Sequence, residues 1–136
     1  MTEGYILIGI GEKYEILAKN LIKTMRHHGD TREVNLITEV DRHDPLYRSC
    51  RTEFERGGTY PKINLDKYLT FDHNIFLDAD VLCLGDTQQV WDIFHSRDQY
   101  IQQIGSHHVP SFHCHVYGYD KEVGHPIPAV HGGCIY

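Results

Sequence analysis

The chain has 136 residues, 40% hydrophobic and 24% charged, a balance typical of one soluble globular domain with a real core. Its formal net charge of −6 argues against nucleic acid as a partner, because phosphate backbones are bound by basic faces. No apolar run reaches the ~20 residues that span a bilayer, and the first residues lack the basic start of a signal peptide. The 4 cysteines are scattered without a Cys-x-x-Cys pair, so we expect reduced thiols and a cytoplasmic location.

The first 38 residues follow a strand–helix–strand pattern. Residues 5–10 are rich in β-branched and aromatic side chains and predict a buried strand, closed by Gly9 and Gly11. Residues 12–28 predict a helix and residues 34–38 a second strand. The apolar helix positions recur three and four apart on one face: Tyr14, Leu17, Leu21 and Met25. This order predicts parallel strands joined by a right-handed crossover.

The middle of the chain is more polar before it returns to an apolar run. Residues 41–58 are charged and predict a mostly solvated segment, which could contain a short helix. Residues 61–69 predict a helix, with Thr59 as a possible cap and Pro61 in its first turn. Residues 74–77 predict a short strand buried on both faces, of the kind found in parallel sheets.

The strand at 74–77 leads into Asp78-Ala79-Asp80, and a further helix is expected after it. Asp86 is a natural N-cap for a helix that carries Val90, Trp91 and Phe94. Beyond it, residues 100–104 and 129–136 predict strands, with a His-rich irregular segment over 107–128. The chain stops inside an apolar run, so we expect one domain that is the N-terminal part of a longer catalytic domain.

Two carboxylates directly follow the predicted strand at 74–77. In extended backbone, residues i and i+2 point to the same side, so Asp78 and Asp80 can converge at the carboxyl end of the strand. In open α/β sheets, ligands bind at that edge. Hard oxygen ligands select Mg²⁺ or Mn²⁺, and the metal's open positions can take phosphate oxygens. The alternative is that both aspartates are ordinary turn residues at a strand end.

The stretch from Lys62 to Leu69, a short spacer and then Ile75-Phe76-Leu77-Asp78-Ala79-Asp80 resembles the donor-site core of the GT-A glycosyltransferases. The closest resemblance is to glycosyltransferase family 8, the glycogenin and galactosyltransferase-like family. It implies a Rossmann-like α/β fold of the GT-A type, with a mostly parallel central sheet flanked by helices. It also implies that Asp78 and Asp80 bind the metal and that Lys62, at the family spacing, lies on the donor phosphates. Otherwise Lys62 is an ordinary solvated helix lysine.

The same resemblance extends to the amino terminus. In the family, the first strand and its loop bind uracil, and a tyrosine stacks on the base. Tyr14 occupies that place, and Ile8, Ile10 and Gly11 would lie along the nucleotide. The alternatives are that Tyr14 packs in the core and that Gly9 and Gly11 only form a turn.

Residues 131–135, His-Gly-Gly-Cys-Ile, loosely resemble the family's later strand, which faces the donor sugar and the acceptor. There His131 replaces an asparagine and can still hydrogen-bond a sugar hydroxyl, and Gly133 would lie at the donor. The family's His-x-x-Gly-x-x-Lys-Pro type segment, which completes the metal site, has no counterpart in these residues. No catalytic residue is therefore assigned beyond His131 as a possible sugar contact.

The resemblance implies a retaining, metal-dependent transferase that moves a hexosyl group from a UDP-sugar to a carbohydrate or protein hydroxyl. The second hypothesis is a non-catalytic module of the same fold that binds a nucleotide sugar and a metal. A haloacid dehalogenase type phosphohydrolase also uses Asp-x-Asp after a strand, but there the aspartates follow the first strand. The sequence does not reveal the oligomeric state.

Histidines are frequent, at 11 of 136 residues. The pair His107-His108 and the run His113-Cys114-His115 suggest a zinc site, because Cys and His are zinc ligands. Their spacing fits no familiar zinc finger, and the alternative is a polar surface loop.

Overall fold

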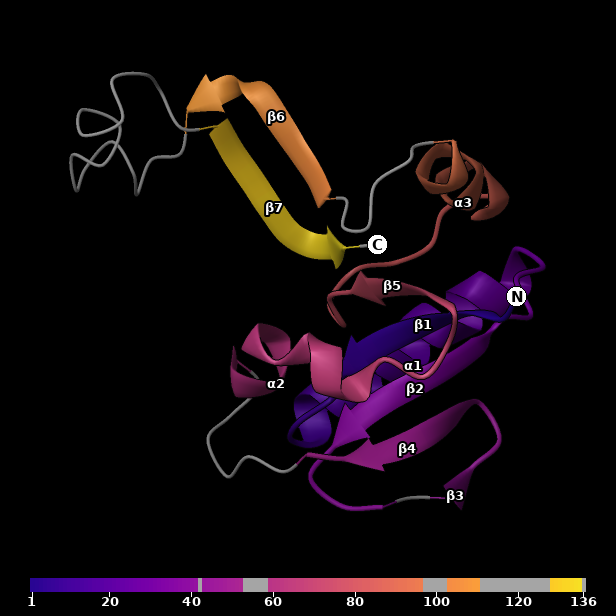
Figure 1. The fold of residues 1–136 in the computed structure, drawn as a ribbon. Helices are drawn as coiled ribbons and strands as arrows, with labels where there is room; N and C mark the ends of the chain where they lie inside the picture. Colours follow the sequence, from indigo (N-terminus) through magenta and orange to yellow (C-terminus); the bar gives the residue numbers. More distant parts are fainter. Residues whose placement is uncertain (42, 53–58, 97–102, 111–127, 136) are drawn as a thin grey trace.

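A computed structural model describes residues 1–41, 43–52, 59–96, 103–110 and 128–135. Within these ranges the strands join in one sheet, and helices lie against it (Figure 1). The strands are β1 (Glu3–Ile8), β2 (Glu33–Thr38), β3 (His43–Asp44), β4 (Tyr47–Arg51), β5 (His73–Leu77), β6 (Gln103–Pro110) and β7 (Pro128–Ile135). The helices are α1 (Glu12–His27), α2 (Thr59–Ile63), the 3₁₀ turn η1 (Leu65–Tyr68) and α3 (Gln88–His95).

The sheet has the strand order β3-β4-β2-β1-β5-β7-β6. Its four central strands, β4, β2, β1 and β5, are parallel, and the outer strands β3, β7 and β6 pair antiparallel to their neighbours. β1 lies in the middle, where Tyr5 is in register with Val34 on one side and Ile75 on the other. The prediction of an α/β fold with a parallel central sheet is confirmed.

The two faces of the sheet bury different residues, because side chains alternate along each strand. On one face, Tyr5 and Leu7 pack with buried residues of α1 and α3. On the other face, Ile6 and Ile37 pack with Tyr68 of η1. Helices therefore cover both faces of the sheet around β1, which explains the buried apolar centres of β1, β2 and β5.

Helix α1 matches the predicted helix closely, with one informative difference. It ends at His27, and Gly29 follows with a φ of 87°. Its fully buried face is formed by Ala18, Leu21, Ile22 and Met25. Tyr14, expected on the same face, is 49% exposed, so it is not a core residue.

A buried polar network attaches α3 to the sheet. The indole of Trp91 donates to the Tyr5 hydroxyl at 2.7 Å, and this hydroxyl donates to Oδ2 of Asp30 at 2.5 Å. The same Oδ2 accepts from the hydroxyl of Thr87, and Oδ1 of Asp30 accepts from the backbone amide of Arg32 at 2.9 Å. Burial alone would raise the pKa of Asp30, but these hydrogen bonds and the guanidinium of Arg32 outweigh it and hold that pKa below its ordinary value.

The segment at 41–58 was expected to be mostly solvated, and this is wrong for part of it. Residues of β3 and β4 add two strands to the sheet, with β4 parallel to β2. Tyr47 is buried and Cys50 packs against the core, whereas Arg48 and Arg51 are exposed. The arginines of this half-buried strand made its sequence look like a solvated segment.

The helix expected at 61–69 is divided. α2 ends at Ile63, and the amide of Asn64 donates to the carbonyl of Pro61 at 3.2 Å, an i to i+3 bond. The tighter 3₁₀ turn η1 follows, which explains why one regular helix does not form. Thr59 is the first helical residue and not the residue before the helix.

Three other expected boundaries also shift. Thr87, and not Asp86, is the N-cap of α3, although Oδ1 of Asp86 accepts from the amide of Gln88 at 2.9 Å. β6 begins at Gln103 and includes His107 and His108, which were expected in an irregular segment. β7 begins one residue before the predicted strand.

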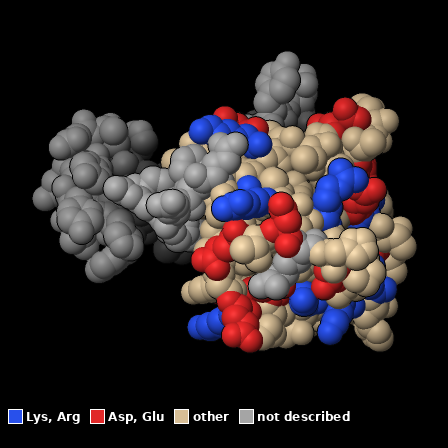
Figure 2. Space-filling model, turned by 90° about the horizontal axis from the view of Figure 1, so that it is seen from below, with Lys and Arg blue, Asp and Glu red and all other residues tan. Residues whose placement is uncertain are grey.

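Figure 2 shows acidic and basic side chains interspersed on one face of the molecule, without a continuous basic surface there. Among the described residues, no helix combines the length and hydrophobicity that are needed to cross a membrane.

Candidate functional site

A cleft opens at the carboxyl ends of β1 and β5, where the parallel strands finish. Its volume is about 330 Å³, at the lower end of the range of small-molecule sites. It is lined by Ile8, Ile10, Tyr14, Lys62, Phe76, Asp78, Ala79 and Asp80. The structure thus brings together residues that are up to 72 positions apart in the sequence (80 − 8). All of them except Phe76 were predicted at the nucleotide-sugar site.

Asp78 and Asp80 reach the cleft by a different backbone path from the one expected. β5 ends at Leu77, and residues 79 and 80 form a turn in place of extended backbone. Both carboxylates and the buried Ala79 between them still line the same cleft. The convergence of the two aspartates therefore comes from a turn at the end of the strand.

Lys62 forms an ion pair with Asp78 inside this cleft. Its Nζ donates to Oδ1 of Asp78 at 2.8 Å, and the two side chains are 33% and 31% exposed. The same Nζ lies 5.1 Å from the centroid of the Phe76 ring, within the range of a cation–π contact. Lys62 comes from α2 and Asp78 follows β5, so the pair joins a helix on one face of the sheet to the sheet's carboxyl edge.

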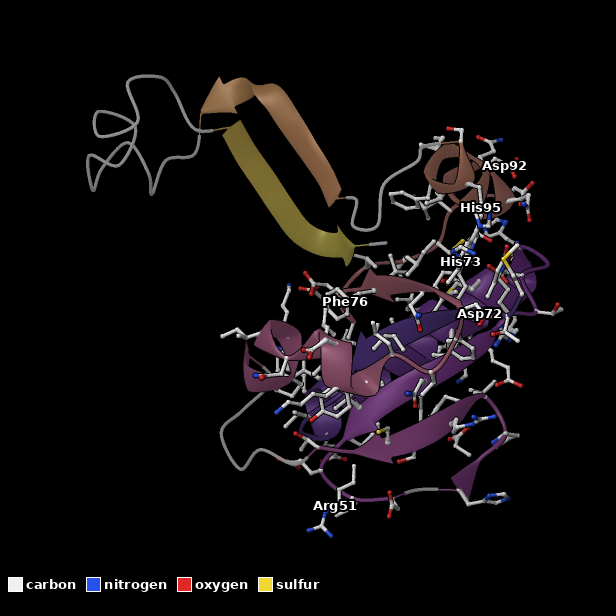
Figure 3. All side chains as sticks on the ribbon, in the orientation of Figure 1. Arg51, Asp72, His73, Phe76, Asp92 and His95 are labelled. Atoms are coloured by element: carbon white, nitrogen blue, oxygen red, sulfur yellow. The ribbon has the colours of Figure 1, made fainter. Side chains whose placement is uncertain are left out.

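Phe76 was not predicted at the site. Figure 3 shows it near the carboxyl end of β5, beside α2, while His73 lies at the opposite end of the strand. It is 3% exposed and belongs to the core around Ile6, Ile37 and Tyr68. It lies two residues before Asp78, within the run that carries the family resemblance, but its apolar side chain indicated only burial. Only the packing of α2 over β5 turns its ring toward the cleft.

Tyr14 lies at the edge of the cleft, in the first turn of α1. Its ring is about half exposed, and Nζ of Lys13 lies 5.5 Å from the ring centroid. Ile8 and Ile10 add apolar surface from the end of β1 and the loop that follows it. An exposed aromatic ring beside aliphatic side chains is an arrangement on which a planar base can stack.

The two glycines between β1 and α1 differ in their roles. The amide of Gly9 donates to the carbonyl of Ile37 at 2.8 Å, and a Cβ at Gly9 would lie 3.0 Å from the Leu36 side chain. Close packing therefore explains Gly9. Gly11 has a φ of 86°, a conformation that favours glycine, and it is the N-cap of α1 without a side-chain hydrogen bond. Gly11 borders the cleft residues Ile10 and Tyr14 but does not itself line the cleft.

The backbone of β7 approaches the end of β5 from its other side. β7 is antiparallel to β5, with Leu77 in register with Cys134. Gly133 directly precedes Cys134 in β7. His131 lies two residues further along β7, and its side chain lies outside the described part of the structure.

The two carboxylates suit a hard divalent cation. Among the described residues, no three His, Cys, Asp or Glu side chains are grouped so that they could hold a metal ion. Asp78 and Asp80 would therefore supply two oxygen ligands, and other ligands would come from water or phosphate. Mg²⁺ is commonly bound in this way, by one or two carboxylates together with substrate phosphates. The donor set fits Mg²⁺ or Mn²⁺.

The histidines and the cysteine of the zinc hypothesis have no described side chains. Residues 113–115 lie outside the described residues, as do the side chains of His107 and His108.

Comparisons with known proteins support the fold. No protein-family model matches the chain, and no curated protein matches it in sequence. Its structure is similar to that of the glycosyltransferase GlyE from Streptococcus pneumoniae TIGR4, with a TM-score of 0.67 and 11% sequence identity. The match covers 99% of this chain and 33% of that chain, so this chain spans about a third of GlyE's length. The chain therefore has the Rossmann-like α/β fold of a glycosyltransferase, as the sequence predicted.

Proposed function

We propose that this chain is the donor-binding domain of a glycosyltransferase that binds a UDP-sugar with Mn²⁺ or Mg²⁺. The observation that carries the proposal is the composition of the cleft. An aromatic ring, a lysine and two carboxylates meet at the carboxyl edge of a parallel sheet, where α/β folds bind their ligands. The similarity to the fold of GlyE, a glycosyltransferase, also supports this proposal.

Each part of the cleft suits one part of the donor. Tyr14, Ile8 and Ile10 form a surface for the uracil base, and the first turn of α1 borders it. Lys62 provides a positive charge for the diphosphate, and Asp78 and Asp80 would hold the cation. A bound divalent cation supplies Lewis-acid stabilisation of the leaving diphosphate. Gly133 and His131 of β7 would lie near the sugar end of the site, as the family resemblance implies.

Transfer of the hexosyl group to a carbohydrate or protein hydroxyl, with retained configuration, belongs to the same proposal. It depends on the family 8 resemblance. The chain's own contribution is to position the donor and to stabilise charge on the diphosphate.

The decisive test is calorimetric titration of UDP with and without Mn²⁺. In Asp78→Ala and Asp80→Ala, we expect the Mn²⁺-dependent affinity for UDP to fall by at least about tenfold, because a metal ligand is lost. Asp66→Ala, which removes an exposed carboxylate on η1 outside the cleft, is the matched control and should bind like the wild type. Thermal unfolding of all three variants should show an intact domain. UDP binding that needs no metal and is unchanged in both cleft variants would refute the proposal.

A second candidate function is donor binding without transfer. It is favoured by the metal site, to which the described residues contribute only two carboxylates. Release of UDP from a UDP-sugar by the 136-residue chain, with or without a hydroxyl acceptor, distinguishes the two. Turnover supports a transferase, and tight binding without turnover supports a binding module.

A further inference from the structure

The positively charged ammonium group of Lys62 lies at the proposed metal site of the cleft. Oδ1 of Asp78, a carboxylate assigned to the metal, accepts a hydrogen bond from Nζ of Lys62 at 2.8 Å. The face of the Phe76 ring lies 5.1 Å from the same Nζ, so the ammonium has two favourable partners. In the ligand-free site, Lys62 therefore neutralises one of the two carboxylates.

This arrangement puts Lys62 in competition with a divalent cation. A metal ion on Oδ1 of Asp78 shares this oxygen with the ammonium, and a metal ion on Oδ2 of the same carboxylate lies next to it. Two unit charges of the same sign 4 Å apart repel by about 1 kcal/mol even in water, and a divalent ion doubles this energy. A bare cation must therefore displace Lys62 or bind beside it at a cost.

A nucleoside diphosphate removes this conflict. Its diphosphate oxygens coordinate the metal and also offer hydrogen-bond acceptors to the displaced ammonium. The lysine side chain is long and flexible, and its ammonium is a compact charge that can change partners without a fixed geometry. Since both side chains are about a third exposed, the exchange does not require burial of an unpaired charge.

We propose that Lys62 is an exchangeable counter-ion, which holds Asp78 in the empty site and moves to the diphosphate when the metal and the nucleotide bind together. This inference rests on the proposed function. Its consequence is that the metal and the nucleotide bind cooperatively. The nucleotide draws Lys62 away from Asp78 and so frees the carboxylate for the metal. The metal takes Asp78 and so frees Lys62 for the diphosphate. By linkage, UDP and the metal then raise each other's affinity by the same factor.

The test measures binding of Mn²⁺ alone, from the electron paramagnetic resonance signal of the free ion, and then of UDP at saturating Mn²⁺. In Lys62→Met we expect Mn²⁺ alone to bind about three- to tenfold more tightly, because the competing charge is gone. UDP at saturating Mn²⁺ should bind about tenfold more weakly, because one charged contact with the diphosphate is lost. The factor by which UDP raises Mn²⁺ affinity should therefore shrink.

Two further variants serve as controls. Lys67→Met makes the same substitution on an exposed residue of η1 outside the cleft and should match the wild type in every titration. Lys62→Arg keeps the charge and should keep the weak binding of Mn²⁺ alone. It also provides a test if Lys62→Met does not fold.

Two results would overturn the exchange. One is binding of Mn²⁺ alone to Lys62→Met that is no tighter than to the wild type. The other is tight binding of Mn²⁺ alone to Lys62→Arg, equal to that of Lys62→Met. Failure of UDP to bind the wild type at any Mn²⁺ concentration is a different result, which overturns the donor-site function itself.

Discussion

The exposure of Tyr14 favours a role in binding the base over a role in core packing. In Tyr14→Ala we expect the affinity for UDP at saturating Mn²⁺ to fall by about tenfold, since base–aromatic stacking contributes about 1–3 kcal/mol. Binding of Mn²⁺ alone and the unfolding temperature should change little, because the ring is half exposed and outside the core.

Ile16→Ala is the matched control for this variant. Ile16 is 52% exposed on the same helix and does not line the cleft. Its affinity for UDP should be that of the wild type. If Tyr14→Ala also binds UDP normally, the base does not stack on this ring.

At the scale of single residues, the sequence predicted which charged side chains would lie in the cleft. Asp78, Asp80 and Lys62 are charged residues beside predicted elements, and the structure places all three in one cleft. Sequence reasoning fails for Phe76, because an apolar residue in a buried strand gives no sign of which part of its ring remains accessible. The ion pair between Lys62 and Asp78 was also not predicted, since it depends on how α2 packs against β5.

At the scale of elements, the hydroxyl group of Tyr5 contributes to the attachment of α3 to the sheet. In Tyr5→Phe we expect the free energy of unfolding to fall by about 2–3 kcal/mol. The change removes the hydroxyl that accepts from the buried indole N–H of Trp91 and that donates to Asp30. Urea unfolding at neutral pH measures the difference.

Tyr14→Phe removes a hydroxyl from a half-exposed ring and is the control, with an expected change below about 0.5 kcal/mol. Equal stability of the two variants would show that the network around Tyr5 contributes no net stability.

Elements with a clear hydrophobic period were predictable, and β3 and β4 were not. α1, β1, β2 and β5 have apolar residues at the spacing of a helix or in a continuous buried run. β4 pairs with only one parallel neighbour on its inner side, and its exposed positions are arginines. Because of these charges, β4 was predicted as a solvated segment, although its pairing with β2 and β3 buries part of it.

For the whole molecule, Asp30 links stability to pH. Its pKa is lowered by folding, so its contribution is present above the pKa of the unfolded chain and is lost as pH falls through the folded value. We therefore expect the free energy of unfolding to decrease below about pH 4. Asp44 and Asp72, whose pKa values are also lowered, act in the same direction.

The variant Asp30→Asn isolates this contribution. An amide has one acceptor oxygen, whereas Asp30 accepts hydrogen bonds on both oxygens, so the variant should lose about 2–3 kcal/mol at pH 7. Between pH 7 and pH 3 it should lose less stability than the wild type. A steeper acid dependence in Asp30→Asn, measured by urea unfolding at both pH values, would contradict this assignment.

The central position of β1 has a consequence for how the protein forms. Glu3 of β1 is in register with His73 of β5, and the two are 70 positions apart in the sequence. At about 5–20 residues per second of synthesis, β1 leaves the ribosome several seconds before its second neighbour exists. Pairing across so long a loop is a slow, late step of folding. We therefore expect β1, which ends at the cleft, to stay unpaired on its β5 side during this interval, when that edge can pair with other chains.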